Sequence, residues 1–420
     1  MFMEFKDREE NEKKYKTRDS KFIWILIVVL ALILTNFTTY ILGSRLPVKG
    51  TRRVSEDIYQ DMMDFKKLFI VKDNLEKYYD GEIDETLLVE SAVKGMTESL
   101  KDPYTVYMNN EEYKDFSTQT EGDYVGLGLQ VGIKEEKVVV IAPFEDSPAK
   151  KAGVLSGDII EKVDGTAVTA KDYEKAVSMM KGEKDTYVTI TITREGKGTF
   201  DVKIKREVIT LTTVTGEMLE DGIGLITVTV FDEHTNDQFT RAVDNLTKKG
   251  MKAMIVDLRQ NPGGWLTQAI DITSKFIPKG KVLVSTEDKY NNKEEYKSKG
   301  GDLIGMPLAV LIDNGTASAS EIFSGAVRDY KVGTLIGEKS FGKGIVQSVL
   351  SEKRYGFGDG TALKVTTSKY YTPNGENIHH KGISPDIEVK FPKELLEKPY
   401  NKKTDPQIIK ALEVVKGKLK

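Results

Sequence analysis

A 21-residue stretch without a charged residue, Phe22 to Leu42, constrains this chain more than any other feature of its sequence. A helix of that length spans roughly 31 Å, which matches the hydrocarbon core of a bilayer. A cleaved signal peptide is the alternative, but the run is longer than a signal h-region and Ile41 to Arg45 is a poor cleavage site. We therefore expect a transmembrane helix over 22–42.

The orientation of this helix follows from its flanking charges. Basic residues are denser before the helix (Lys6, Arg8, Lys13, Lys14, Lys16, Arg18, Lys21) than after it (Arg45, Lys49, Arg52, Arg53). Because basic residues stay on the cytoplasmic side, 1–21 is predicted to be a cytoplasmic tail. The body of the chain would then lie outside the cytoplasm, anchored to the cell membrane.

Composition excludes several classes of function. The 420 residues include 62 Lys and Arg against 65 Asp and Glu, so the net charge is −3 and no basic surface for nucleic acid is expected. Cysteine is absent, which removes disulfides, thiolate metal ligands and a cysteine nucleophile. The three histidines, His234, His379 and His380, lack the spacing of a helical zinc site. We expect no metal and no other cofactor.

Residue patterns divide the body into regions. Residues 55–115 have apolar residues at helical spacing, and 122–206 reads as a compact module of short strands with two helices. From Gly222 to about Val389 strands alternate with helices, which is typical of an α/β domain. The tail 405–420 predicts an amphipathic helix. The expected fold is therefore multidomain, of mixed α+β and α/β type.

Two small-residue turns follow predicted strands of the α/β domain. The turn Pro262-Gly263-Gly264 leaves backbone N–H groups uncovered, which could donate to a developing oxyanion, although alone it would be read as a tight loop. Ser318 and Ser320 lie where a predicted strand meets a predicted helix, where the helix N-terminus stabilises negative charge. One of these serines is expected to cap the helix, with Glu321 as its capping-box partner.

A glycine-lined loop surrounds Lys343. Residues 337–344 nearly match the phosphate-binding pattern G-x-x-x-x-G-K-[ST], but Gly344 replaces the hydroxyl residue that would hold Mg²⁺. The following run Ile345–Leu350 predicts a strand rather than a helix, so a nucleotide hydrolase is disfavoured. Burial could lower the pKa of Lys343 enough for its neutral amine to deprotonate a serine. Gln347 could orient that amine or pair with backbone.

Together these segments resemble the carboxyl-terminal processing proteases, the tail-specific serine peptidase family with a PDZ domain and a Ser-Lys dyad. The family's S-A-S-E-I segment matches Ser318, its F-G-K-G segment matches Lys343, and a glutamine four residues further matches Gln347. Additional matches at 102–108 and 370–386 spread the resemblance over most of the chain beyond about residue 60.

The resemblance implies roles for individual residues. Ser318 would be the nucleophile, Lys343 the general base, and Gln347 the residue that orients the lysine. The oxyanion hole would use the N–H group of Ala319 and that of Gly263 or Gly264. Residues 60–115 and 207–400 would form the cap and core of the protease domain, with a core of crotonase-like type.

The module 122–206 resembles a PDZ domain. Its carboxylate-binding loop would be Gly126, Leu127, Gly128 and Leu129, whose backbone N–H groups capture a chain end while the peptide adds as a strand. Without the resemblance, these glycines would mark only the entry to a strand. In the family the module recognises apolar C-terminal tails or gates access to the dyad, and both alternatives stay open.

The sequence thus predicts a membrane-anchored serine endopeptidase that cleaves exported proteins near their C-termini. Its partners would be protein or peptide substrates with free C-termini and the lipid bilayer. The resemblance adds an activating or scaffolding protein and a homodimer. The main alternative is a membrane-anchored PDZ adaptor with an inactive protease fold, and the intact serine, lysine and glutamine argue against it.

Overall fold

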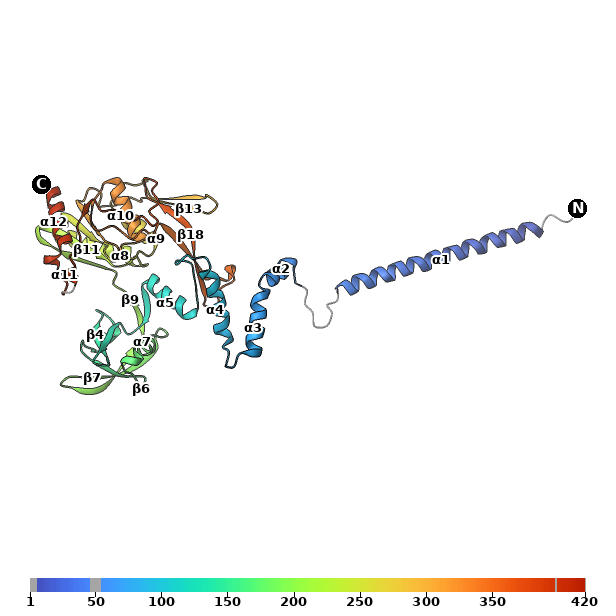
Figure 1. Ribbon diagram of the computed structural model, residues 1–420, viewed down its shortest axis with the longest axis horizontal. Helices are drawn as coiled ribbons and strands as arrows, with labels where there is room; N and C mark the ends of the chain where they lie inside the picture. The colour runs from blue at the N-terminus through green and yellow to red at the C-terminus, as the bar shows by residue number, and fades with distance from the viewer. Residues whose placement is uncertain (1–5, 46–53, 397–398, 420) are drawn as a thin grey trace. The chain divides into compact units, whose positions relative to one another are not determined.

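The computed structural model describes residues 6–45, 54–396 and 399–419. It divides the chain into two compact units, Met1–Leu88 and Val89–Lys420, and Figure 1 labels many of their helices and some of their strands. The first unit contains α1 (Lys6–Arg45), α2 (Glu56–Asp64) and α3 (Lys66–Tyr78), and α4 (Glu85–Glu98) crosses the boundary.

Helix α1 contains the long apolar run. Within the described residues, Ser20–Gly43 is the one helical segment long and apolar enough to cross a membrane. Its position near the N-terminus fits a membrane anchor or a signal sequence. Helices α2 and α3 bury none of their residues, and apolar side chains such as Met62 on α2 and Phe69 on α3 are exposed.

The second unit is built around a six-stranded sheet. Its strands, in spatial order, are β10 (Val214–Met218), β11 (Ile223–Val228), β12 (Ala253–Asp257), β15 (Leu308–Ile312), β16 (Thr334–Gly337) and β19 (Ile387–Glu388). From β11 to β19 the neighbours are parallel, and β10 pairs antiparallel with β11. The alternation of strands and helices predicted for this part of the chain is therefore present, although the antiparallel edge strand was not anticipated.

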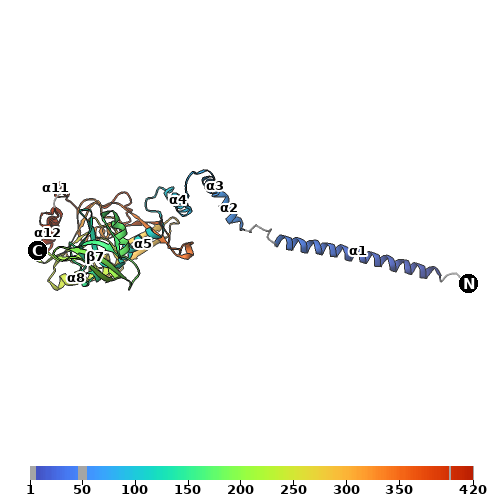
Figure 2. The ribbon, with the colours of Figure 1, turned by 90° about the horizontal axis from the view of Figure 1, so that it is seen from below.

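Both faces of this sheet are covered, because successive side chains of a strand point to opposite faces. On β12, Met254 and Val256 pack in one core with helices α8 (Thr235–Lys248), α9 (Leu266–Ser274) and α10 (Ala319–Tyr330). Ala253 and Ile255 face the other core, which is closed by α12 (Pro406–Leu419). Figures 1 and 2 show α12 at the C-terminal end of the chain beside α11 (Lys393–Leu396).

A second, antiparallel sheet completes the core. It contains β1 (Val106–Met108), β13 (Val282–Asp288), β14 (Lys293–Lys297), β17 (Ile345–Leu350) and β18 (Ala362–Tyr371). The ten-residue strand β18 pairs with β1, β13 and β17, so segments far apart in the sequence converge on it. The sequence had indicated β17 with its correct bounds, but nothing in it had indicated a separate sheet.

The strand-rich module that lies between β1 and β10 in the sequence has a hydrophobic core of its own. Its sheet consists of β3 (Leu129–Lys134), β4 (Lys137–Pro143), β5 (Ile159–Val163), β6 (Thr166–Ala167), β7 (Tyr187–Arg194) and β8 (Gly198–Lys205), with helices α6 (Pro148–Lys151) and α7 (Tyr173–Met180). Helix α5 (Asn110–Glu121) precedes the module, and the paired strands β2 (Asp123–Gly126) and β9 (Glu207–Thr210) lie at its entry and exit. Short 3₁₀ turns lie at Ala170–Asp172, Glu220–Gly222, Lys353–Tyr355 and Lys402–Thr404.

The C-terminal helix is fixed by a buried charge cluster at its start. The guanidinium of Arg259 donates to the carboxylates of Asp257, at the end of β12, and Asp405, at distances of 2.6 and 2.8 Å. It also donates to the side-chain oxygen of Gln407 at 2.8 Å. Asp405 is itself buried and accepts backbone N–H groups from the first turn of α12. The predicted tail helix therefore docks onto the strand end that leads into the Pro-Gly-Gly turn.

Candidate active site

A cavity of about 380 Å³ lies where the loops after β12 and β15 meet the second sheet. Its wall includes Ser318, Lys343 and Gln347, which the sequence singled out, together with Gly264 and Ala319. The other lining residues are mostly apolar or uncharged; they are Phe116, Thr120, Pro262, Trp265, Leu266, Thr267, Ile322, Ile345, Val346, Val349, Lys364 and Tyr370. Five of the six residues proposed for catalysis and charge stabilisation therefore line one cavity, and Gly263 is the exception.

Ser318 has a strained backbone at the start of α10. Its φ of 54° and ψ of −115° lie in a region that non-glycine residues rarely adopt. Tyr370, fully enclosed on β18, donates its hydroxyl to the Ser318 carbonyl at 3.2 Å. Such strain persists only where the surroundings hold it, and it projects the Ser318 side chain from a tight strand-to-helix turn.

Much of that support comes from Glu321, whose side chain is completely buried. Its Oε2 accepts the backbone N–H groups of Ser318 at 2.8 Å and of Lys343 at 2.9 Å. Its Oε1 accepts the Ser340 hydroxyl at 2.6 Å and the Gly342 N–H at 2.7 Å. Burial raises the pKa of Glu321, and these hydrogen bonds oppose the rise. The predicted capping partner thus joins the serine turn to the lysine loop.

The Lys343 amine lies in a partly buried position beside the cavity. Burial lowers its pKa, and the nearby charge of Lys364 lowers it further, whereas Asp102 and Glu321 act in the opposite direction. Its Nζ lies 4.7 Å from the centroid of the Tyr104 ring. Among the described residues the amine has no ion pair, and no hydrogen bond joins it to the Ser318 hydroxyl. It is thus a partly desolvated amine that shares the cavity wall with the serine and lies over an aromatic ring.

Gln347 lies on β17, directly after an irregularity in the pairing of this strand with β18. Its side-chain nitrogen is buried and has no hydrogen-bond partner in the described part of the chain. It therefore lines the cavity without contacting the Lys343 amine through a hydrogen bond.

The two candidate oxyanion glycines differ in what their N–H groups face. The Gly263 N–H is taken by the side-chain oxygen of buried Asn261, at 2.9 Å. The Gly263 carbonyl accepts the Phe231 N–H at 2.8 Å, and in a trans peptide the following N–H points the opposite way. That N–H belongs to Gly264, which lines the cavity and, like the Ala319 N–H, has no hydrogen-bond acceptor among the described residues.

Gly263 nevertheless needs to be a glycine. A Cβ atom added to it would lie 2.8 Å from the Ser318 Cβ and 2.9 Å from the Ala319 nitrogen. Its φ of 103° is also unfavourable for any side chain. The close approach of the two turns thus depends on this position.

The predicted PDZ loop is separate from this cavity. Gly126 ends β2, Leu127 is buried, and Leu129 begins β3. Gly128 has a φ of 71°, and a Cβ atom there would lie 2.4 Å from the Ser147 Cβ. The N–H groups of Leu127 and Gly128 have no acceptor within the described residues, as a carboxylate-binding loop requires. Close to this loop, Tyr173 on α7 donates its hydroxyl to the Val131 carbonyl of β3 at 3.1 Å, which joins the helix to the strand.

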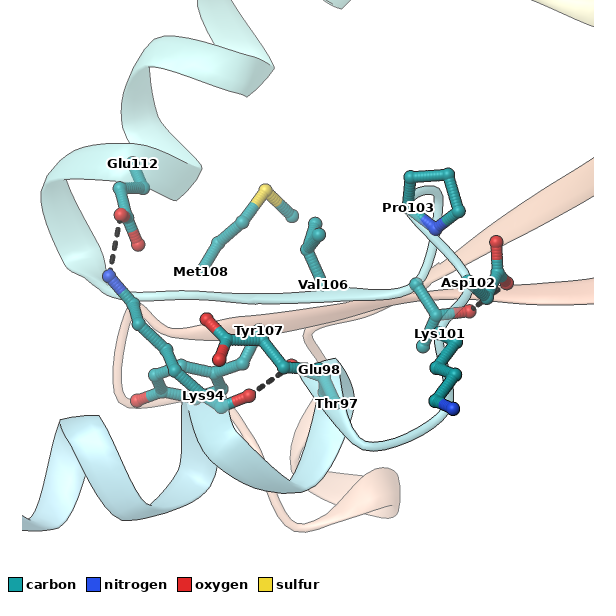
Figure 3. A pocket seen from close by; sticks show the side chains of 11 residues that line it. Lys94, Thr97, Glu98, Lys101, Asp102, Pro103, Val106, Tyr107, Met108 and Glu112 are labelled. Carbon is teal, nitrogen blue, oxygen red and sulfur yellow. Dashed lines mark hydrogen bonds and ion pairs between the residues drawn. The ribbon is translucent and has the colours of Figure 1, made fainter.

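A larger pocket of about 590 Å³ lies beside α4 and β1 (Figure 3). Lys94 and Glu112 form an ion pair of 2.7 Å across it, and Asp102 and Pro103 lie at its other end. It contains neither Ser318 nor Lys343, so we assign the candidate active site to the smaller cavity. The two are related through the loop 102–105, because Tyr104 of this loop contacts Lys343.

Sequence reasoning missed several residues around the site. Asp102, Tyr104 and Lys364 affect the Lys343 amine, and Asn261 holds the Gly263 N–H. The Asp102-Pro103-Tyr104-Thr105 segment had stood out only as a family match. No spacing rule could have brought it to Lys343, because the contact depends on the pairing of β1 with β18.

These features define a serine peptidase with an attached PDZ domain, and comparison with known proteins agrees. The model of peptidase family S41 matches residues 222–389, a PDZ domain model matches 125–204, and the model of the activating protease CtpB N-terminal domain matches 37–112. The chain belongs to the carboxy-terminal processing proteases of peptidase family S41.

Individual relatives are similar over most of their length. The carboxy-terminal processing protease CtpA of Bacillus subtilis (strain 168) is 37% identical over 370 residues, which cover 88% of this chain and 77% of that protein. A carboxy-terminal-processing protease of Bartonella bacilliformis is 37% identical over 348 residues, covering 81% and 78%. Among solved structures, the photosystem II D1 C-terminal processing protease is 28% identical, with 77% of this chain and 86% of that chain covered and a TM-score of 0.45.

Replacing the carboxylate of Glu321 tests whether its hydrogen bonds hold the Ser318 turn and the Lys343 loop together. Glu321→Gln keeps the size of the side chain but leaves two of four donors without an acceptor, whichever way the amide is turned. Each unsatisfied buried donor costs about 1–3 kcal/mol. We expect kcat for peptide hydrolysis to fall about tenfold or more, with a lowered thermal unfolding midpoint. The control Glu295→Gln, on an exposed strand, should change neither. An unchanged kcat in Glu321→Gln would contradict this role.

Proposed function

We propose that this protein is a membrane-anchored serine endopeptidase with a Ser318–Lys343 dyad that cleaves exported proteins near their C-termini. The observation that carries the proposal is the cavity shared by Ser318 and Lys343, in which the lysine amine is partly buried and lacks an ion pair among the described residues. A dead protease scaffold would not need an amine in this state. An aqueous surface lysine would keep its usual pKa and could not act as a base near neutral pH.

In the proposed reaction the neutral Lys343 amine takes the proton of the Ser318 hydroxyl as its oxygen attacks the scissile carbonyl carbon. The carbonyl oxygen becomes an oxyanion, for which we propose the N–H groups of Gly264 and Ala319 as donors. Lys343 then gives its proton to the leaving amine, and the C–N bond breaks. Water, deprotonated in turn by Lys343, hydrolyses the acyl ester and regenerates Ser318.

The resting position of Lys343 implies one side-chain movement. Its amine has to turn from the face of Tyr104 toward Ser318, which rotation about its flexible side chain allows. Catalytic hydrogen bonds are often long or absent before substrate binds. Gln347 is proposed to orient the amine after this turn by accepting a hydrogen bond from it through the side-chain oxygen. The position of Gln347 in the same cavity wall as Lys343 supports this role.

Removal of either dyad member tests the mechanism directly. Ser318→Ala should abolish cleavage of an unstructured protein, and Lys343→Ala should lower the rate by about 10²- to 10⁴-fold, the usual contribution of a general base. The matched control Lys339→Ala changes an exposed lysine of the same loop and should retain full activity. In the wild type, activity should fall as the pH drops through the depressed pKa of Lys343, because protonation removes the base. Cleavage by Ser318→Ala, or an undiminished cleavage rate in Lys343→Ala, would eliminate the dyad.

We also propose the domain division inferred from the sequence, with a PDZ domain over 122–206 and a protease domain formed by 60–115 and 207–400. The parallel strands β11, β12, β15 and β16 with flanking helices support a core of crotonase-like type. For the PDZ domain we propose recognition of substrate tails or gating of the active site. The N–H groups of Leu127 and Gly128, which have no acceptor in the part of the chain that the structure describes, support the capture of a chain end. The homodimer and the activating or scaffolding partner stay predictions from the resemblance.

The two proposed PDZ roles are distinguished by an apolar C-terminal tail that is either joined to the substrate peptide or added as a second peptide. If the domain recognises tails, an apolar tail with a free carboxylate should raise kcat/KM only for the substrate that carries it. If the domain gates the site, the same tail added as a separate peptide should accelerate a substrate without a tail. Both are measured by fluorogenic cleavage, with the amidated tail as the control. If the tail has neither effect, both proposed roles of the PDZ domain are wrong.

The membrane anchor is proposed from Ser20–Gly43 together with the basic residues that precede it. We expect the chain to stay in the membrane fraction after alkaline carbonate extraction, and protease added outside intact spheroplasts should digest its body. Intact-mass measurement should find the N-terminal helix still attached. A mature form that begins beyond about residue 43 and is released on extraction would identify the segment as a signal sequence instead.

A further inference from the structure

The candidate cavity contains a second lysine that the proposed mechanism does not use. Lys364 lines its wall together with Ser318 and Lys343, and no acidic residue lines it. Within the described residues neither lysine has an ion-pair partner. The cavity is therefore a site with two amines and no compensating carboxylate in its wall.

Lys364 is held in place by the middle of a sheet. It lies on β18 opposite Val106 of β1 and Val349 of β17, so its backbone is paired on both sides. Tyr370, six residues further along the strand, lines the same cavity and donates its hydroxyl to the Ser318 carbonyl. The Lys364 Nζ lies 5.2 Å from the centroid of the Phe116 ring. The strand thus directs this amine into the cavity rather than into bulk water.

The chemistry of the wall indicates which ligand such an amine would take. An ammonium that is partly desolvated and unpaired is unfavourable until an anion reaches it. The remaining wall, including Trp265, Leu266 and Ile322, suits apolar side chains. A peptide with apolar residues and one carboxylate complements both features, because a charge-assisted hydrogen bond to the carboxylate compensates the amine.

We propose that Lys364 binds a carboxylate of the substrate peptide close to the scissile bond, and so makes the site selective for anionic, otherwise apolar segments. The carboxylate is either the α-carboxylate of a nearby chain end or the side chain of an Asp or Glu. This inference rests on the proposed function, since it assigns a substrate feature to the same site. Lys364 is a specificity residue in this arrangement, and Lys343 remains the base.

Three matched peptides distinguish the sources of the carboxylate. All share one apolar quenched-fluorescent sequence: the first has an internal Gln and a free C-terminus, the second the same Gln and a C-terminal amide, and the third a Glu in place of Gln with the amide. They are cleaved by the full-length chain in detergent, as wild type, Lys364→Gln and Lys364→Arg. Lys369→Gln, which changes an exposed lysine on the same strand that does not line the cavity, is the matched control.

Wild type and Lys369→Gln should cleave at least one carboxylate peptide with kcat/KM about tenfold or more above the neutral peptide. Lys364→Gln should reduce that ratio to about one, and Lys364→Arg should keep most of it. Preference for the first peptide alone identifies the chain end as the source, and preference for the third identifies an acidic side chain. Any preference supplied by the predicted PDZ loop would survive in Lys364→Gln, so only the difference between variants counts.

Two results would overturn the proposal. One is an equal loss of kcat/KM on all three peptides in Lys364→Gln together with a displaced pH profile, which would mean that Lys364 acts only through the pKa of Lys343. The other is an unchanged carboxylate preference in Lys364→Gln. If wild type cleaves none of the peptides, the proposed function fails instead. Anisotropy of the same peptides on Ser318→Ala, with and without Lys364→Gln, then still reports whether Lys364 contributes to carboxylate binding.

Discussion

The arrangement of this site depends on one buried carboxylate. Glu321 accepts four hydrogen bonds from two loops that are distant in the sequence, one carrying Ser318 and the other Lys343. A desolvated carboxylate is stable only when its oxygens are satisfied, so neither loop can move away without exposing an uncompensated charge. The strained backbone of Ser318 is held by the same bonds. A residue expected only to cap a helix thus fixes the separation of the two candidate catalytic groups.

The parallel sheet brings the other half of the site together. Strands β12 and β15 are neighbours, and their carboxyl ends lead into the Pro-Gly-Gly turn and the Ser318 turn. Asn261 then links these turns: its carbonyl accepts the Ala317 N–H at 3.0 Å, and its side chain holds the Gly263 N–H. Arg259, two residues earlier, connects the first turn to the C-terminal helix through Asp405. Residues far from the chemistry therefore restrain the position of Gly264.

Local patterns in the sequence predicted much of this arrangement. The alternation after Gly222 predicted the strands and helices of this domain, and three segments of the sequence pointed to Ser318, Lys343 and the Pro-Gly-Gly turn before any contact was known. The second sheet was not predictable, because β18 pairs with strands that are separated from it by up to about 260 residues, and such pairings leave no periodic signal. Tyr104 and Lys364 were missed for that reason. The choice between Gly263 and Gly264 depended on peptide orientation, which residue type does not encode.

The same carboxylate that orders the loops also leaves the lysine amine free. An acidic neighbour normally raises the pKa of a lysine by pairing with it, which would oppose its use as a base. Here the four acceptor positions of Glu321 are occupied by backbone and hydroxyl donors, and Lys343 contributes its backbone N–H rather than its amine. The Lys343 amine lies over the Tyr104 ring, and the charge of Lys364 repels its protonated form. Burial and this repulsion together outweigh the attraction of Asp102 and Glu321, so the pKa of Lys343 falls. Because the Glu321 carboxylate is fully hydrogen-bonded, it both holds the backbone of Lys343 in place and leaves the Lys343 amine without an ion pair among the described residues.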